Sequence, residues 1–226
     1  MPYVKENSAS NTASSSNSTS QVCTITSPTS GRLLTAVWSS NTDTNPTSIT
    51  GGGVTTWATA VNHTDGVRRI VIYYGIVDTT PTTSVTVNYA KLSAARWLAV
   101  DEWSGNASSS VLDVTATGSG TGTALSTGSN TPTVAGVALV AGTYHSSNAA
   151  PTASGGGFTA HADFGATDDV FLAHYKIATS IQAEECTLTF ASSSGWRACW
   201  AAFKPAATTG GIVVNGRSRM ASHLAM

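Results

Sequence analysis

The chain has 226 residues and a formal net charge of −1, and only 10% of its residues are charged. Globular domains carry roughly 25% charged residues; here Ser and Thr, with 30 and 35 residues, fill the difference. The balance of 11 basic to 12 acidic residues lacks the basic field of a nucleic-acid-binding protein, and no apolar run approaches the roughly 18 residues of a membrane span. Because Ser, Thr, Gly and Asn are poor helix-interior residues, we expect a soluble all-β protein that binds neither nucleic acid nor a membrane.

The opening segment, residues 1–21, differs in composition from the rest of the chain. It lacks the apolar core of a secretory signal, and residues 7–20 are almost wholly Ser, Asn, Thr and Ala. A segment of this kind cannot bury enough apolar surface to order itself. We therefore expect an extended arm that a neighbouring chain holds in place.

Residues 22–106 and residues 107–205 contain similar sequence blocks in the same order, roughly 100 residues apart. Most blocks are typical of strands, because they alternate apolar and polar residues or form short apolar runs. The segment 91–100 is the one helix candidate, and we interpret it as a turn leading into a strand because its repeat position holds a Ser-rich turn signal. The paired blocks are 27–38 with 131–144, 51–54 with 155–158, 69–74 with 170–175, 85–90 with 186–191, and 96–103 with 196–203.

These blocks predict an antiparallel β-sandwich, jelly-roll-like, that is built from an internal duplication. The expected domains are the arm at 1–21, a first repeat at 22–106, a second repeat at 107–205 and a tail at 206–226. We expect one compact body, but the sequence leaves open whether the halves share one sandwich or form two packed side by side. Aromatic residues supply the expected core, namely Trp38, Trp57, Tyr74, Trp97, Trp103, Phe190, Trp200 and Phe203.

The chain has three cysteines, and an odd number makes a poor disulfide framework. Cys186 and Cys199 are the best candidate pair, since they lie on two strands that we expect to form a hairpin. Small buried thiols are the favoured interpretation. In the tail, the apolar run 212–214 either adds a strand to the sheet edge of a neighbour or belongs to a frayed end.

Few residues suggest chemistry. A nucleophile elbow is absent, and the Gly-rich segment 118–122 reads as a mobile turn because neither a Lys nor a helix follows it. The best metal-like group is His161 and Asp163 with Asp168 and Asp169; a metal site needs three or more converging ligands, so we favour solvated residues flanking a hairpin. His174 takes the repeat position of Tyr73, which favours a packed imidazole.

Acidic neighbours occur at Asp101 with Glu102, at 168–169 and at 184–185. Neighbours on a strand point to opposite faces, so a sequential pair cannot form an acid/base dyad. The carboxylates beside Trp103 suggest at most a sugar platform, and the repeat replaces them with Ala201 and Ala202. We predict a non-enzymatic protein with no catalytic, cofactor-binding or metal-binding residues and no cofactor.

One series of motifs resembles a known group of proteins. The resemblance is carried by the segments 33–38, 56–58, 70–74, 85–87 and 97–105 and by the close of the second half at 200–205. In these segments the chain resembles duplicated β-sandwich proteins of tailed-bacteriophage virions, of the capsid decoration and minor tail type. The likeness covers roughly residues 22–205 and concerns the scaffold, so no functional residues carry over.

The resemblance implies a structural protein that is assembled in the host cytoplasm and exposed on the particle surface. It would dock on the capsid through its terminal arm and a sheet edge, as a homo-oligomer in contact with the major capsid protein or with tail proteins. The alternatives are a minor tail or fibre protein of the same fold, a secreted carbohydrate-binding module that uses exposed Trp residues, and a glycan hydrolase that uses Asp101 and Glu102. A glycan therefore stays open as a ligand.

Overall fold

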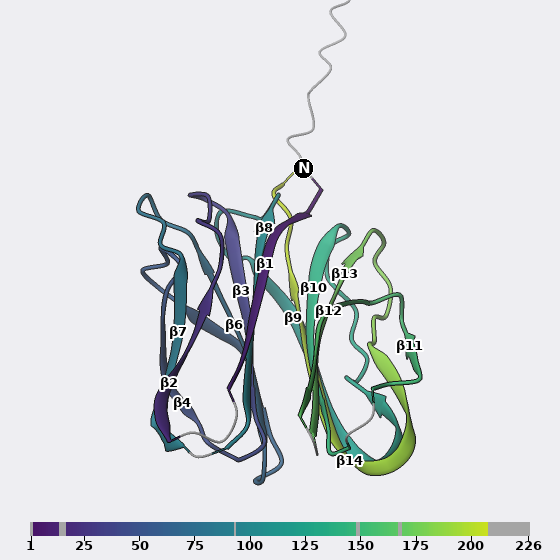
Figure 1. Ribbon diagram of the computed structural model, residues 1–226. Coiled ribbons are helices and arrows are strands. Elements are labelled where there is room, and N and C mark those ends of the chain that lie inside the picture. Colours follow the sequence, from purple (N-terminus) through teal and green to yellow (C-terminus); the bar gives the residue numbers. More distant parts are fainter. Residues whose placement is uncertain (1, 14–16, 93, 148–149, 167–168, 208–226) are drawn as a thin grey trace, which may run out of the picture.

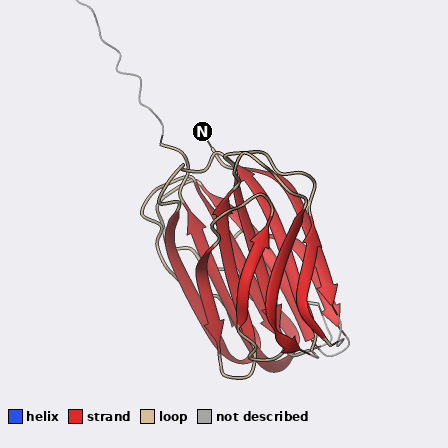
Figure 2. Ribbon diagram, turned by 90° about the vertical axis from the view of Figure 1, so that its left-hand side faces the viewer, coloured by secondary structure: helices blue, strands red, loops and turns tan. Residues whose placement is uncertain are grey.

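The computed structural model describes residues 2–13, 17–92, 94–147, 150–166 and 169–207. These residues form antiparallel strands and no helix, so the predicted all-β sandwich fold is confirmed, and no helical segment in them could cross a membrane (Figures 1 and 2). The strands are β1 (Val4–Ala13), β2 (Ser18–Thr24), β3 (Leu33–Ser40), β4 (Pro46–Gly51), β5 (Ala58–Thr64), β6 (Arg69–Ile76), β7 (Ser84–Leu92), β8 (Arg96–Ser104), β9 (Leu112–Ser126), β10 (Val137–His145), β11 (Ala153–Gly155), β12 (Thr159–Ala166), β13 (Asp169–Ala178) and β14 (Thr187–Phe203).

The strands pack as two sandwiches that lie face to face (Figure 1). In the first sandwich the sheet β1-β8-β3-β6-β5 is covered by the sheet β2-β7-β4. In the second, β9 and β14 run from one layer into the other, and the order is β11-β14-β10-β13-β12 with β9 beside β14. The halves therefore form two sandwiches within one body.

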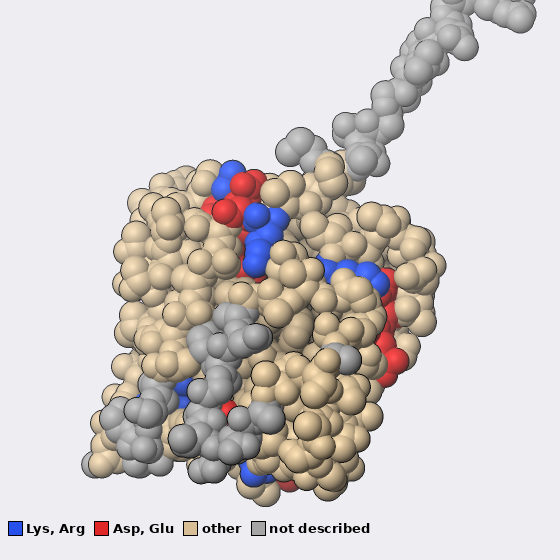
Figure 3. Space-filling view, turned by 45° about the vertical axis from the view of Figure 1, so that its right-hand side comes forward, with Lys and Arg blue, Asp and Glu red and all other residues tan. Residues whose placement is uncertain are grey.

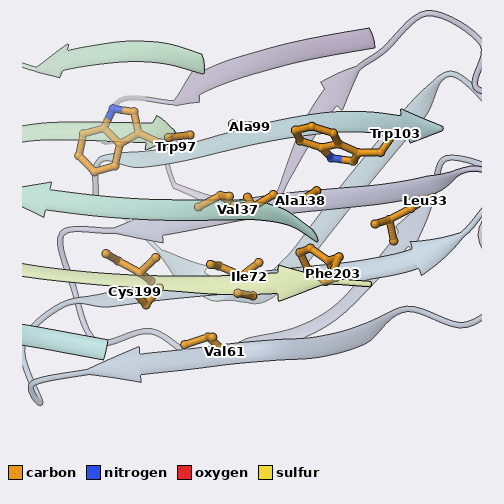
Figure 4. Packing of buried hydrophobic residues seen from close by; sticks show 14 of the residues in the cluster. Leu33, Val37, Val61, Ile72, Trp97, Ala99, Trp103, Ala138, Cys199 and Phe203 are labelled. Carbon is orange, nitrogen blue, oxygen red and sulfur yellow. The ribbon is translucent and has the colours of Figure 1, made fainter. Parts of the chain in front are cut away.

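The largest core cluster lies between the two sandwiches. Strands β3, β8 and β10 are buried on both faces, and this explains why their sequences are near-continuous apolar runs. Figure 4 shows side chains of both halves in the shared core, with Trp97 and Trp103 at opposite ends of β8 and Phe203 of β14 near Leu33. Burial of apolar surface in this core stabilises the contact between the two halves.

The two halves have the same strand order. The order β1-β8-β3-β6-β5 corresponds to β9-β14-β10-β13-β12. Register agrees with this match: Ala36 pairs with Val100 of β8, as Ala141 pairs with Trp200 of β14. Asp101 then corresponds to Ala201, as the sequence blocks predicted. That the symmetry arose by duplication stays a prediction.

The structure corrects the predicted arm. Residues 4–13 are not free: β1 pairs along the whole of β8, and residues 18–24 form β2 beside β7. Tyr3 anchors this end, because the residue is 2% exposed and its hydroxyl donates to the backbone oxygen of Lys204 at 2.9 Å. Backbone pairing to a buried neighbour orders a strand whose own side chains are poor in apolar surface. The first sandwich thus begins at β1 and not at residue 22.

Two further sequence predictions concern the ends of elements. Residues 91–92 end β7 and residues 96–100 begin β8, so the described part of the segment 91–100 leads into a strand and forms no helix, as predicted; residue 93 lies outside the described residues. The tail prediction falls mostly on residues 208–226, including the run 212–214, which lie outside the described residues.

Candidate functional site

A group of polar side chains lies between the sandwiches where the β1–β8 edge meets β12 and β13. Oδ1 of Asp101 on β8 lies 2.9 Å from Nε2 of His161 on β12 and 3.7 Å from Nζ of Lys5 on β1. The ammonium of Lys5 also sits 4.0 Å from the ring centroid of Tyr175. The side chains of Asp101 and His161 are 5% and 3% exposed, so the contact is almost fully removed from water.

A β-bulge places His161 in this group. Ala160 pairs with His174 and Ala162 pairs with Ala173, which leaves His161 as the extra residue of β12. His161 therefore reaches the shared interface. His174 is buried too, and burial, together with the charge of His161, lowers its pKa to about 4. As the repeat predicted, His174 is a packed imidazole.

The structure does not bring the predicted metal-like group together. His161 contacts Asp101, whereas Asp169 accepts hydrogen bonds from the Tyr144 hydroxyl and, at 2.9 Å, from Asn41 Nδ2. Asp168 and the side chain of Asp163 lie outside the described residues. Within the described part of the chain, no group of three or more His, Cys, Asp or Glu side chains could hold a metal ion.

Asp101 and Glu102 point to opposite faces of β8, as strand geometry requires. Glu102 accepts hydrogen bonds from the backbone N–H of Thr29 at 2.7 Å and from Arg32 at 3.2 Å, and Asn7 donates to its other oxygen. Each carboxylate therefore has its own basic or polar partners. The pair acts as two separate anchors, one for each face of the sheet.

A second polar group closes the other end of the shared interface. Arg197 of β14 forms an ion pair with Asp65 in the β5–β6 turn, and the guanidinium groups of Arg197 and Arg68 lie 5.2 and 5.0 Å from the Tyr144 ring centroid. Burial alone would raise the pKa of Asp65, but N–H donors of the turn and the charge of Arg197 outweigh it and lower the pKa. Asp169, which accepts a hydrogen bond from the Tyr144 hydroxyl, also belongs to this group, and burial raises its pKa.

Sequence reasoning singled out Asp169 but not Lys5, Asp65, Arg68 or Arg197. Arg197 carried a usable signal, because it places a basic residue inside an apolar run where the first repeat has Trp97. Both polar groups join the two sandwiches, so their geometry is that of structural ion-pair networks.

The three cysteines are free, buried thiols. The expected hairpin between Cys186 and Cys199 does not form, because Cys199 lies on β14 and Cys186 directly precedes that same strand. Cys186 belongs to a core inside the second sandwich and Cys199 to the core between the sandwiches. Burial raises the pKa of Cys23 to about 11 and those of Cys186 and Cys199 to about 12. Thiols held in the protonated form are poor nucleophiles.

The surface carries two grooves of interest. One, of about 920 Å³, lies where the halves join beyond the ends of β8 and β14, and the backbone bridge between Asn106 and Pro205 crosses this region. It is lined by Pro2, Asn106, Ala107, Ser108, Ser109, Val134, Ala135, Gly136, Lys204, Pro205, Ala206 and Ala207.

The second groove, of about 330 Å³, lies between β4 and β5, the edge strands of the first sandwich. Its lining includes Trp57, which is half-buried, and Tyr73. Four other tryptophans, Trp38, Trp97, Trp103 and Trp200, are fully buried. Trp196 is half-buried in the second sandwich.

Comparison with protein-family models, with curated proteins and with solved structures finds no match to this chain.

Proposed function

We propose that the protein is a non-enzymatic structural component of a bacteriophage virion, and that it decorates the capsid. One observation carries the proposal: a doubly packed β scaffold presents a hydroxyl-rich surface with few charges, and several of those charges pair within the chain. Five basic side chains have carboxylate partners, namely Lys5, Arg32, Arg69, Lys176 and Arg197. On the face drawn in Figure 3, blue and red adjoin in small patches, and the other described residues are tan.

Such a surface suits contacts with other proteins through backbone hydrogen bonds and apolar burial, and these contacts depend weakly on salt. Since β1 belongs to the protein's own sheet, the first residues are not available as a docking arm. The groove at the junction of the halves is the favoured contact for a neighbouring virion protein. Apart from Lys204 it is lined by small or medium-sized uncharged side chains, and Val134 in its lining is 37% exposed.

Particles of the phage that encodes this chain provide the test. We expect gold-labelled antibody against the purified chain to mark the capsid at regular positions. We also expect occupancy to change less than about twofold when particles are washed in about 0.05 M or about 1 M NaCl. Absence of the chain from purified particles would contradict the proposal. Label confined to the tail would replace the capsid role with the minor tail or fibre role.

A pair of variants tests the docking groove. Val134→Asp places a charge on the groove and should reduce occupancy of the capsid. Val67→Asp is the matched control, because Val67 is 56% exposed in the turn at the far end of β6. Equal occupancy of the two variants would remove this groove from the docking surface.

A further inference from the structure

We propose that the groove between β4 and β5 binds a neutral glycan, with Trp57 as its stacking platform. The wall and floor residues are mostly uncharged and polar, and they are Asn45, Pro46, Thr47, Ser48, Ile49, Trp57, Thr59, Asn62 and Tyr73. The volume of about 330 Å³ is at the lower end for small-molecule sites. A groove of this size takes one or two sugar rings.

The aromatic floor is held in a fixed orientation. The indole Nε1 of Trp57 donates to the backbone oxygen of Gly51 at 3.1 Å. Gly52, with φ of +69°, lets the turn pass beneath the indole, where a Cβ would lie 2.5 Å from Leu34 and 3.6 Å from the Trp57 ring. A partly exposed ring that is fixed before binding loses little entropy when a pyranose C–H face packs on it.

The amides in the groove are also oriented. The guanidinium of Arg69 can only donate, so the Asn62 atom that it contacts is the oxygen. The Nδ2 group of Asn62 then donates to Oδ1 of Asn45 at 3.1 Å. This arrangement leaves the Nδ2 group of Asn45 available to donate to a ligand hydroxyl. The Tyr73 hydroxyl also makes no hydrogen bond with the described part of the protein, and Tyr73 lines the same groove.

Charge complementarity selects the ligand class. Arg69 stands behind the amides, but Asp43 neutralises it at 2.7 Å. The groove therefore offers neither an unpaired cation for a sialylated or sulfated glycan nor an unpaired anion for an amino sugar. Hydroxyls, amides and an aromatic ring fit the hydroxyl groups and the apolar face of a neutral hexose.

In the part of the second sandwich that the structure describes, the chain has no counterpart of the segment that carries Trp57. Phe158 corresponds to Val54: each directly follows three glycines, and each lies against the equivalent residue of β13 or β6, Lys176 or Gly75. Residues 55–57, which include Trp57, lie between Val54 and β5, whereas β12 begins directly after Phe158. Phe158 is 7% exposed, and Lys176 lies over its ring while it bonds Glu184. The platform is thus specific to the first half.

The full chain should be titrated with methyl glucoside, methyl galactoside, methyl mannoside, maltose and cellobiose, with the Trp indole N–H signals followed by NMR. At least one neutral sugar should shift the Trp57 signal. Trp57→Ala should then abolish binding, and Asn45→Ala should weaken it about tenfold, the value of one lost hydrogen bond. Trp196→Ala is the matched control, because it removes a half-buried indole from the other sandwich and should leave affinity unchanged.

Sialyllactose and a sulfated disaccharide complete the panel. Tighter binding of either anionic sugar would overturn the neutral class. The absence of any response at about 50 mM, far above the millimolar constants of weak sites, would overturn the site itself, as would equal affinity of Trp57→Ala and the parent chain. Unfolding curves of each variant separate lost binding from lost structure. The virion role does not depend on this result, because antibody labelling measures location and sugar titration measures the groove.

Discussion

The two sandwiches reach the same strand order by different routes. In the first, the chain changes sheet between strands: β1 of the larger sheet is followed by β2 of the smaller one, and β7 of the smaller sheet is followed by β8 of the larger one. In the second, the single strands β9 and β14 pass through both layers, with register shifts between Thr189 and Ser194. The Gly-rich segment 118–122 and the Ser-rich segment 192–195 were expected to be turns, and this expectation is wrong: they lie inside β9 and β14, where they allow the bend. The same strand order therefore forms whether two separate strands or one bent strand connects the two layers.

The halves also differ in what they present to each other. At one edge of the shared interface Lys5, Asp101 and His161 meet, while the equivalent positions of the other edge hold Leu112, Ala201 and Ala60. The apolar set packs against the shared core. A symmetric fold therefore has one charged edge and one apolar edge, which favours a single orientation of the two sandwiches.

Replacing one large core side chain should give the largest effect. Trp103 lies between the sandwiches and Trp38 lies inside the first one, and both are 0% exposed. Trp103→Ala and Trp38→Ala should each lower the free energy of unfolding by about 3–5 kcal/mol. Because the shared core is the largest, we expect one transition for both halves, by circular dichroism and by fluorescence. Two separate transitions, with Trp38→Ala shifting only one, would show that the sandwiches unfold independently.

His174, which takes the position of Tyr73 in the second half, should make the protein less stable in acid. The pKa of His174 is lowered to about 4 from an ordinary value near 6.5, so the unfolded chain binds more protons between these values. This contribution to stability is fully present above about pH 6.5 and is lost as the pH falls to about 4, by about 3 kcal/mol. Burial also lowers the pKa of His63 and His145, which adds a loss in the same direction.

His174→Gln is the variant that isolates this effect. It removes one titrating group, so the slope of stability against pH should flatten while any cost of the substitution itself stays constant. Denaturant unfolding at several pH values between 4 and 7 measures the slope. An unchanged slope would place the acid sensitivity elsewhere.

The smallest expected effects concern the charged edge. Asp101→Ala leaves Lys5 and His161 without their anion and should cost about 2 kcal/mol. The triple variant Lys5→Leu, Asp101→Ala, His161→Ala copies the apolar edge, and its stability should return to within about 1 kcal/mol of the parent, because a buried ion pair often adds little over an apolar set. If the triple variant lost more than the single one, the charged edge would be a net source of stability.

Much of the fold was predictable from local sequence. Alternation and short apolar runs located most strands of both halves, and the repeat correctly matched Asp101 with Ala201 and Tyr73 with His174. The prediction of a free arm for the first residues was wrong, because composition indicates only how much apolar surface a segment can bury by itself. A Ser- and Asn-rich strand such as β1 gains its order from backbone pairing with β8.

The sites were less predictable than the fold. His161 and Asp101 were each noted in the sequence, but their contact joins two halves and depends on a one-residue bulge in β12. The Trp57 groove arises between the edges of two sheets, and Trp57 lies in a segment, residues 55–57, that has no counterpart between Phe158 and β12.

By itself the sequence determined the all-β class, the repeated strand pattern and the scarcity of charge, since these follow from residue type and its period along the chain. Only the tertiary structure decided that two sandwiches share a core, that one interface edge is charged, and that one tryptophan faces an open groove. Those features depend on contacts between residues far apart in the chain, and burial energy selects such contacts only when whole sheets pack together.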